Sequence, residues 1–171
     1  MSAPSAEFTR ELIALLPAVR AFAISLTGRV DRSDDLVQET VMKAWAASAS
    51  FQMGTNMKAW LFTILRNIAL NQFQRQKREV EDVDGQLAST IATPGEQEGR
   101  IALNEMHAAL GKLPPDQREA VILVGGAGFS YEEAAEMCGV ALGTLKSRVS
   151  RGRAALANLL DKPAGDATEA A

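Results

Sequence analysis

The chain of 171 residues contains only one cysteine and one histidine. Because Cys138 has no second cysteine to pair with, an intramolecular disulfide framework is excluded. Because His107 also stands alone, a His/Cys zinc site of ordinary spacing is excluded. The sequence therefore does not describe a small secreted module held together by disulfides or zinc, and we expect neither a metal nor a cofactor.

Aromatic residues make up only 5% of the chain, and runs of β-branched residues are scarce. Alanine and leucine are abundant instead, and this composition favours helices over a sandwich or barrel. No uncharged stretch reaches the length of a membrane span, since Arg10, Glu11 and Arg20 interrupt the apolar residues near the N-terminus. We therefore expect an all-α, soluble, cytoplasmic protein without a membrane partner.

Basic residues are missing from one internal stretch. Residues 79–99 carry the acidic side chains of Glu79, Glu81, Asp82, Asp84, Glu96 and Glu98. Their glycine, proline and serine content also leaves too little apolar surface to form a core. The sequence thus predicts two small helical domains and a flexible acidic linker. The predicted bounds are 8–78 for the first domain, 79–99 for the linker, 100–160 for the second domain and 161–171 for a polar tail.

Two short segments, by contrast, are purely basic. They are residues 66–78, with Arg66, Arg75, Lys77 and Arg78, and residues 144–156, with Lys146, Arg148, Arg151 and Arg153. Each is a candidate nucleic-acid contact in a chain whose net charge of -3 disfavours indiscriminate attraction to DNA. The alternative for each segment is an ordinary solvated helix face.

The beginning of the N-terminal domain shows apolar residues at helical spacing over residues 8–28. Pro17 is predicted in the first turn of the main segment, and Gly28 is predicted to end it. Ser33 is predicted to cap the next helix, because two acidic residues follow it where the helix dipole favours negative charge.

The second predicted helix has two different faces. Its buried face is predicted to comprise Val37, Val41, Ala44 and Trp45. The opposite face carries Asp35, Glu39 and Met42, with Gln38 at its edge. An exposed methionine among carboxylates favours a partner surface, whereas capping and ordinary solvated residues are the alternative.

A third helix is predicted from Met57 to about Arg78. Its core stripe is predicted to comprise Leu61, Ile64, Leu65 and Ile68, with Thr63, Arg66, Asn67, Gln74 and Lys77 pointing away from the core. Arginine and amide side chains beside Trp60, Phe62 and Phe73 are typical of sites that hold phosphates and exposed bases. Core packing is the alternative for each of these aromatic residues.

The C-terminal domain carries the most informative pattern. Pro114 and Pro115 predict the start of a helix, and glycines 125, 126 and 128 are predicted to break it. Ser130 then precedes a short helix through Cys138, Gly139 provides a turn, and a second helix begins at 142–144. This order is typical of a helix-turn-helix. A plain helical hairpin is the alternative, but it gives no reason for a basic second helix.

The faces of that second helix follow from its periodicity. If Leu145, Val149, Gly152 and Leu156 face inwards, then Thr144, Ser147, Ser150 and Arg151 face outwards, with Lys146, Arg148 and Arg153 beside them. Short hydroxyl residues permit close approach to a DNA groove, and the cations supply base and phosphate contacts. Cys138 is predicted in the core, and neither it nor His107 has neighbours that would make a catalytic site.

The chain resembles an extracytoplasmic-function (ECF, group 4) sigma factor of bacterial RNA polymerase. The resemblance rests on DDLVQET at 34–40, NMKAWLFTILRNIALN at 56–71 and LPPDQREAVILVGGAGFSYEEAAEMCGVALGTLKSRVSRGRAAL at 113–156. Within that family, the chain most resembles the alphaproteobacterial general-stress (EcfG-like) subgroup. One departure is Ala141, where the family often has a serine or a similar capping residue.

The resemblance implies a role for each domain. Sigma region 2 would bind the β′ subunit of core polymerase through Asp35, Leu36, Gln38 and Glu39, and the partners would include the β subunit as well. It would bind the promoter -10 element through Asn56, Lys58, Trp60, Arg66, Asn67 and Asn71. Sigma region 4 would bind the -35 element through Thr144, Lys146, Ser147, Arg148, Ser150, Arg151 and Arg153.

The same resemblance implies a transcription initiation factor for stress-response genes, controlled by a small helical, NepR-like anti-sigma factor. It implies no enzyme activity, no catalytic residue and no small-molecule substrate. One alternative is a sigma-like decoy that binds an anti-sigma factor without engaging polymerase. Another is an independent helix-turn-helix regulator that binds a palindromic duplex by itself.

Overall fold

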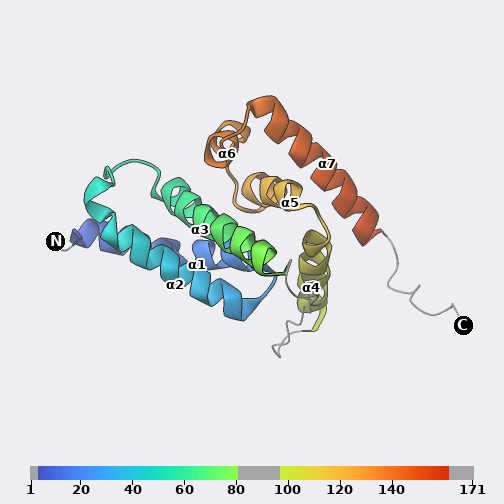
Figure 1. Cartoon of the computed structure of the whole chain (residues 1–171), viewed down its shortest axis with the longest axis horizontal. Coiled ribbons are helices and arrows are strands. Elements are labelled where there is room, and N and C mark those ends of the chain that lie inside the picture. The colour runs from blue at the N-terminus through green and yellow to red at the C-terminus, as the bar shows by residue number, and fades with distance from the viewer. Residues whose placement is uncertain (1–3, 81–96, 162–171) are drawn as a thin grey trace, which may run out of the picture. The chain divides into compact units, whose positions relative to one another are not determined.

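The computed structural model describes residues 4–80 and 97–161, all of whose regular elements are helices (Figure 1). The chain divides into two compact units, residues 1–92 and 93–171, called unit 1 and unit 2 below. Helix α3 ends at Val80 and helix α4 begins at Gln97, so helices extend into both ends of the predicted linker. Residues 81–96 of that linker, and 162–171 of the predicted tail, lie outside the described residues.

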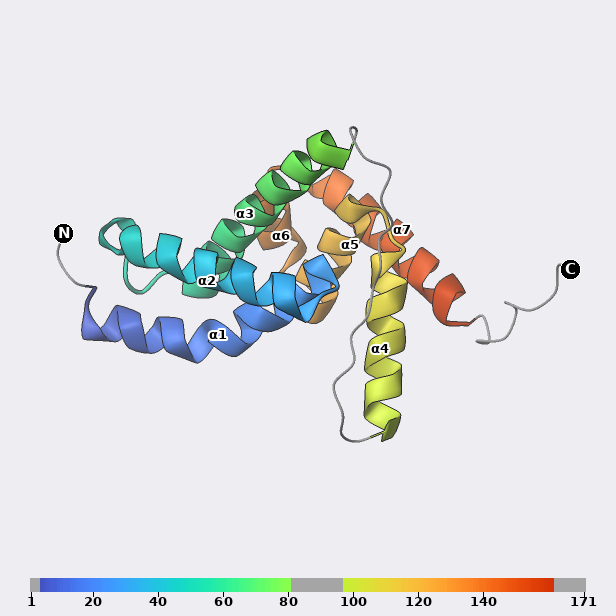
Figure 2. The same ribbon diagram turned by 60° about the horizontal axis from the view of Figure 1, so that its bottom comes forward.

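Unit 1 contains α1 (Ala6–Thr27), α2 (Val30–Ala46), a short 3-10 turn (Ser48–Ser50) and α3 (Met57–Val80). Figure 2 shows α1 and α2 side by side. Gly28 ends α1 with a left-handed φ of 67°, as predicted. The prediction for Pro17 is wrong, because the helix begins at Ala6 and Pro17 lies in its interior. Proline has no backbone N–H, so one carbonyl in the preceding turn loses its hydrogen bond within the helix. Because the Pro17 side chain is exposed, solvent can reach this turn.

The predicted cap of α2 is also wrong. The helix begins at Val30, with the extended Arg29 as its N-cap, because the chain turns back into helical conformation only one residue after Gly28. Ser33 is consequently buried inside the helix, where its hydroxyl donates to the carbonyl of Val30 at 2.6 Å. Thr40 lies about two turns further along the same buried face. Its hydroxyl donates in the same way to the carbonyl of Leu36 at 2.7 Å.

These two hydroxyl residues displace the predicted buried face of α2. The buried positions are Ser33, Leu36, Thr40 and Ala44. Val37 and Val41 are half-buried, and Trp45 is 45% exposed, so placing its side chain in the core was wrong. The core of α3 follows the prediction more closely, since Leu61, Leu65 and Ile68 are buried while Ile64 is half-buried. Phe62 of α3 also joins the core, stacked on Phe22 of α1 at 4.5 Å between ring centroids.

Unit 2 contains α4 (Gln97–Gly111), α5 (Pro115–Val121), α6 (Tyr131–Cys138) and α7 (Leu142–Leu160), with a π-helical turn at Ile122–Gly126. The prolines start α5 as predicted. Gly125 and Gly126 do not break the helix, because they belong to the π turn, and Gly128 with a φ of +77° follows it. Of the three glycines predicted to break the helix, Gly128 is the one that lies at the break.

Two contacts fix how the helices of unit 2 meet. The guanidinium of Arg118 donates to the carbonyls of Leu110, Gly111 and Leu113 at 2.7, 2.8 and 3.1 Å. These bonds cap the C-terminal end of α4, where carbonyls have no partner within the helix. Burial lowers the pKa of Arg118 from its ordinary value. At Gly152, α7 approaches α5 so closely that an added Cβ would lie 2.6 Å from Val121 Cγ2.

Candidate polymerase and nucleic-acid interfaces

Helices α6 and α7 form a helix-turn-helix. Ser130 caps α6 through a reciprocal pair of hydrogen bonds: its Oγ accepts from the Glu133 amide at 3.1 Å, and its own amide donates to the Glu133 carboxylate at 2.9 Å. Gly139 closes the turn with a left-handed φ of 65°. Helix α7 then begins after Ala141, which has the extended backbone of an N-cap but no side chain to accept a hydrogen bond.

The inward face of α7 is the predicted one. Leu145, Val149, Gly152 and Leu156 are its buried residues. Of the residues predicted to contact the -35 element, Thr144, Lys146, Ser150, Arg151 and Arg153 are exposed, and Ser147 and Arg148 are half-buried. The Arg151 guanidinium donates to the hydroxyl of Ser147 one turn away, which draws these two outward side chains together.

Two flanks of α7 differ in their charge environment. On one flank Arg148 Nε lies 3.3 Å from Asp116 Oδ2 of α5, and its side chain is only 24% exposed. On the other flank a hollow of about 510 Å³ is lined by Tyr131, Lys146, Val149, Ser150 and Arg153. This hollow combines two cations and two hydroxyls without an acid, a lining suited to a phosphate. Neither Tyr131 nor Asp116 is among the site residues predicted from the sequence.

The residues predicted to contact the -10 element fall into two groups. Asn67 and Asn71 are exposed one turn apart on α3, and Asn56 is exposed at its start, where its side chain accepts from the Ala59 amide at 3.0 Å. The other three are half-buried. Trp60 packs at 4.8 Å from the Phe51 ring, and Lys58 lies 5.6 Å above the Phe62 ring. Arg66 lies two turns beyond Lys58 on the same helix.

The four residues predicted to contact polymerase all lie on α2, but one of them is not at its surface. Asp35 and Gln38 are exposed, and Glu39 is half-buried, where it accepts from Lys43 at 3.1 Å and from Gln72 of α3 at 3.1 Å. Leu36 is 0% exposed, so the structure removes its side chain from the predicted surface and places it in the core of unit 1.

Two large apolar side chains of α2 are exposed as well. Met42 is 66% exposed, as its position among the carboxylates predicted, and Trp45 lies one turn further along the helix. Because apolar side chains on a charged helix are typical of protein interfaces, they strengthen the interpretation of this face as a partner surface. The spacing of apolar residues in the sequence predicted Trp45 to be in the core, so it was not predicted to be part of the partner surface.

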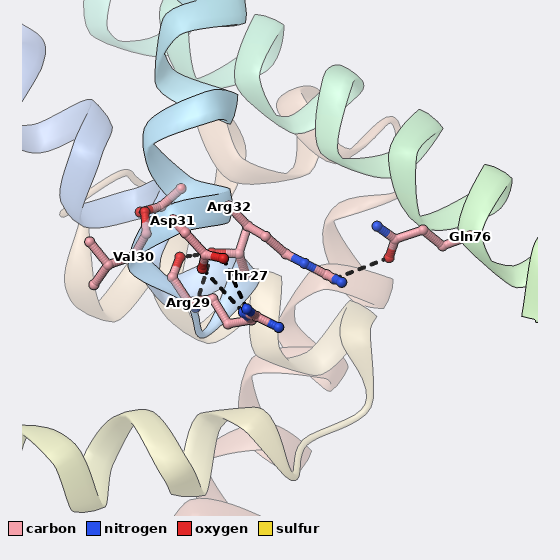
Figure 3. A network of polar contacts seen from close by, with 7 residues as sticks. Thr27, Arg29, Val30, Asp31, Arg32 and Gln76 are labelled. Carbon is pink, nitrogen blue, oxygen red and sulfur yellow. Dashed lines mark hydrogen bonds and ion pairs between the residues drawn. The ribbon is translucent and has the colours of Figure 1, made fainter. Parts of the chain in front are cut away.

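Polar contacts fix the beginning of α2 (Figure 3). Arg29 pairs with Asp31 at 2.9 Å, and this hydrogen bond lowers the pKa of the Asp31 carboxyl. Arg32 reaches across to the side chain of Gln76 on α3 at 3.2 Å. Together with the bond between Gln72 and Glu39, this contact holds the predicted polymerase-binding helix against the predicted DNA-binding helix.

Within residues 4–80 and 97–161, no group of three or more His, Cys, Asp or Glu side chains is arranged to hold a metal ion. No helix in the same ranges is long and apolar enough to cross a membrane.

Both units match known protein families. Residues 12–79 match Sigma-70 region 2, and residues 103–156 match Sigma-70, region 4. A chain that carries these two regions has the domain architecture of a sigma factor.

Comparison with individual proteins narrows this class. The chain is 55% identical over 150 residues to the ECF RNA polymerase sigma factor EcfG of Rhodopseudomonas palustris (strain TIE-1), a match that covers 88% of this chain and 83% of that protein. The chain therefore belongs to the ECF RNA polymerase sigma factors, which are transcription regulators rather than enzymes.

Two solved structures share the fold to different degrees. The sigma factor RpoE from Bartonella quintana, solved in complex with the anti-sigma factor NepR, is 52% identical with a TM-score of 0.84, covering 93% of this chain and 99% of RpoE. The anti-anti-sigma factor PhyR from the same organism, complexed with NepR, is 17% identical with a TM-score of 0.57, covering 88% of this chain and 49% of PhyR. The second similarity concerns the fold alone.

Proposed function

We propose that this sigma factor binds core RNA polymerase through the exposed face of α2 and directs it to promoters of stress-response genes. Asp35, Gln38 and Glu39 supply the polar contacts, and the exposed side chains of Met42 and Trp45 supply the apolar ones. Leu36 supports the surface from beneath without touching the partner. Carboxylates that surround apolar side chains suit a partner with a basic rim and an apolar centre.

Helix α7 is proposed to enter the major groove at the -35 element. The observation that carries this proposal is the separation of its faces: four buried residues on one side, and hydroxyl and cationic side chains on the other. Ser147 and Arg151 lie at the centre of the outward face and are proposed to reach base edges. Lys146 and Arg153 border the hollow beside Tyr131 and are proposed to hold a backbone phosphate.

Helix α3 and its preceding turn are proposed to bind the -10 element. Asn56, Asn67 and Asn71 offer amide donors and acceptors to exposed bases. The aromatic cluster around Trp60 forms an apolar wall beside them, and Lys58 and Arg66 supply positive charge. Tighter binding to single-stranded than to double-stranded DNA would favour promoter melting. The nucleotidyl transfer belongs to polymerase, so this chain itself is proposed to have no enzymatic activity.

A NepR-like anti-sigma factor is the proposed regulator. The 52% identity to a sigma factor solved with NepR supports this partner. The decoy alternative has weaker support, because the anti-anti-sigma factor shares only 17% identity with this chain. Since bacterial polymerase works in the cytoplasm, we propose the cytoplasm as the site of action.

Competition with the housekeeping sigma factor for core polymerase tests the proposed polymerase contact. Asp35→Arg reverses one exposed charge on α2, and Glu7→Arg reverses an exposed charge of the same unit on α1. We expect wild-type protein and Glu7→Arg to compete equally, and Asp35→Arg to lose about tenfold or more in apparent affinity. Equal competition by all three folded proteins would contradict the assignment of α2. Failure of the wild-type protein to compete would favour the decoy or the independent regulator.

A further inference from the structure

Arg148 differs from the other cations of α7. Among the described residues, it is the α7 cation that forms an ion pair, with Nε at 3.3 Å from Asp116 Oδ2. Lys146, Arg151 and Arg153 are exposed. Arg148 therefore lies on the flank of α7 that faces α5, one turn before the tight contact at Gly152. Its guanidinium is held against another helix, whereas the guanidinium of Arg151 bonds to Ser147 within α7.

The carboxylate of Asp116 is itself fixed. Its Oδ1 accepts from the Gln117 amide at 2.9 Å, in the first turn of α5, while Oδ2 faces Arg148. The backbone of Gln117 is in turn packed against α7, because its carbonyl oxygen would lie 3.1 Å from a Cβ at position 152. The ion pair thus joins two helices whose separation is already set by packing. Asp116 is half exposed, so solvent and DNA can reach the pair.

We propose that Asp116 is a positioning residue that determines the promoter specificity of α7 by orienting Arg148. A guanidinium has five N–H donors, and a carboxylate at Nε leaves other donors for a base edge or a phosphate. Restricting the side chain to one direction favours a contact in one register. The adjacent negative charge also weakens the attraction of Arg148 to phosphates in other registers. Both effects raise the ratio of specific to non-specific binding.

This inference rests on the proposed -35 role of α7. Its test uses the chain assembled with core polymerase and two duplexes: a promoter that the wild-type holoenzyme binds, and the same duplex with its -35 segment scrambled. The measured quantity is the ratio of the two dissociation constants over a series of salt concentrations. Glu105→Gln is the matched control, because it removes one exposed acidic charge from α4 of the same unit.

Asp116→Asn is expected to lower the specificity ratio about fivefold to tenfold, in the range of one lost arginine contact. On the scrambled duplex, its affinity is expected to fall more steeply with salt, by up to about one additional phosphate contact. Asp116→Glu is expected to recover part of the ratio, and Glu105→Gln to leave it unchanged. A folded Asp116→Asn protein with the wild-type ratio would overturn the proposal.

A second variant separates positioning from a general loss of structure. Arg148→Gln removes the other partner and is expected to lower the ratio to a similar extent. The double variant is expected to be no worse than either single one, whereas additive losses would overturn the coupling. Replacement of Lys146 and Arg151 by alanine tests the underlying role of α7. If that change leaves promoter binding intact, the -35 assignment itself fails, and the inference fails with it.

Discussion

Replacing Gly152 with alanine is the sharpest test of the packing in unit 2. A Cβ at this position would lie 2.6 Å from Val121 Cγ2 and 3.1 Å from the carbonyl oxygen of Gln117. Val121 is buried and β-branched, so its side chain has little freedom to turn away inside a helix. The carbonyl belongs to the backbone of α5. Relief of the clash therefore requires α5 and α7 to move apart.

The size of the effect follows from two opposing terms. Overpacking of this kind costs about 1–3 kcal/mol, and alanine gains about 1 kcal/mol over glycine in a helix interior. Gly143 of the same helix separates the terms, because a Cβ there meets nothing within 4 Å. We expect Gly143→Ala to be neutral or stabilising. Gly152→Ala should be less stable than that control by about 1–3 kcal/mol.

Urea unfolding can assign the loss to unit 2. Both tryptophans, Trp45 and Trp60, belong to unit 1, so tryptophan fluorescence reports on that unit alone, whereas circular dichroism reports on all helices. Gly152→Ala should shift the dichroism transition to lower urea and leave the fluorescence transition unchanged. Stability equal to that of Gly143→Ala would refute the close approach of α5 and α7 on which this reasoning depends.

Three further changes address unit 2. Arg118→Ala should destabilise it by about 2–3 kcal/mol in urea unfolding, since three carbonyls lose a charged donor; a loss under 1 kcal/mol would contradict this. Ala141→Ser should raise the melting temperature through a gain of about 1 kcal/mol, because it supplies the missing cap of α7, whereas Ala141→Val should not, since valine caps no better than alanine. Burial lowers the pKa of His107, so the unfolded state binds a proton more readily. Stability should therefore decline as pH falls through about 6.5, and His107→Gln should remove that decline between pH 8 and 6.

The sequence predicted α7 well and α2 less well, for a physical reason. In α7 the buried positions are apolar or glycine and repeat at helical spacing, so the pattern alone identifies both faces. In α2 the buried face includes Ser33 and Thr40, whose hydroxyls bond to their own helix. Hydroxyl residues satisfied in this way look like surface residues in a sequence, and the predicted face was consequently shifted toward Trp45.

Other features of the candidate sites depend on residues that meet only after folding. The pair Asp116–Arg148 joins α5 to α7, and the bond from Gln72 to Glu39 joins α3 to α2. No local pattern relates the members of either pair, so the sequence could indicate the charges but not their partners. The burial of Leu36 follows from the same shift of the α2 face, since its neighbours had been assigned to the core instead.

The hydroxyls of Ser33 and Thr40 bond within α2 itself, so the inward and outward faces of this helix can change independently of each other. Because Ser33 and Thr40 need no partner on another helix, the inward face depends only on the shape of α1 and α3. Asp35 and Gln38 on the outward face can then be exchanged to suit a different partner without altering the interior. Glu39 is the exception, because a change there also reaches Gln72 on the helix proposed to bind DNA. A substitution of Glu39 that changes polymerase binding would therefore also be expected to change promoter binding.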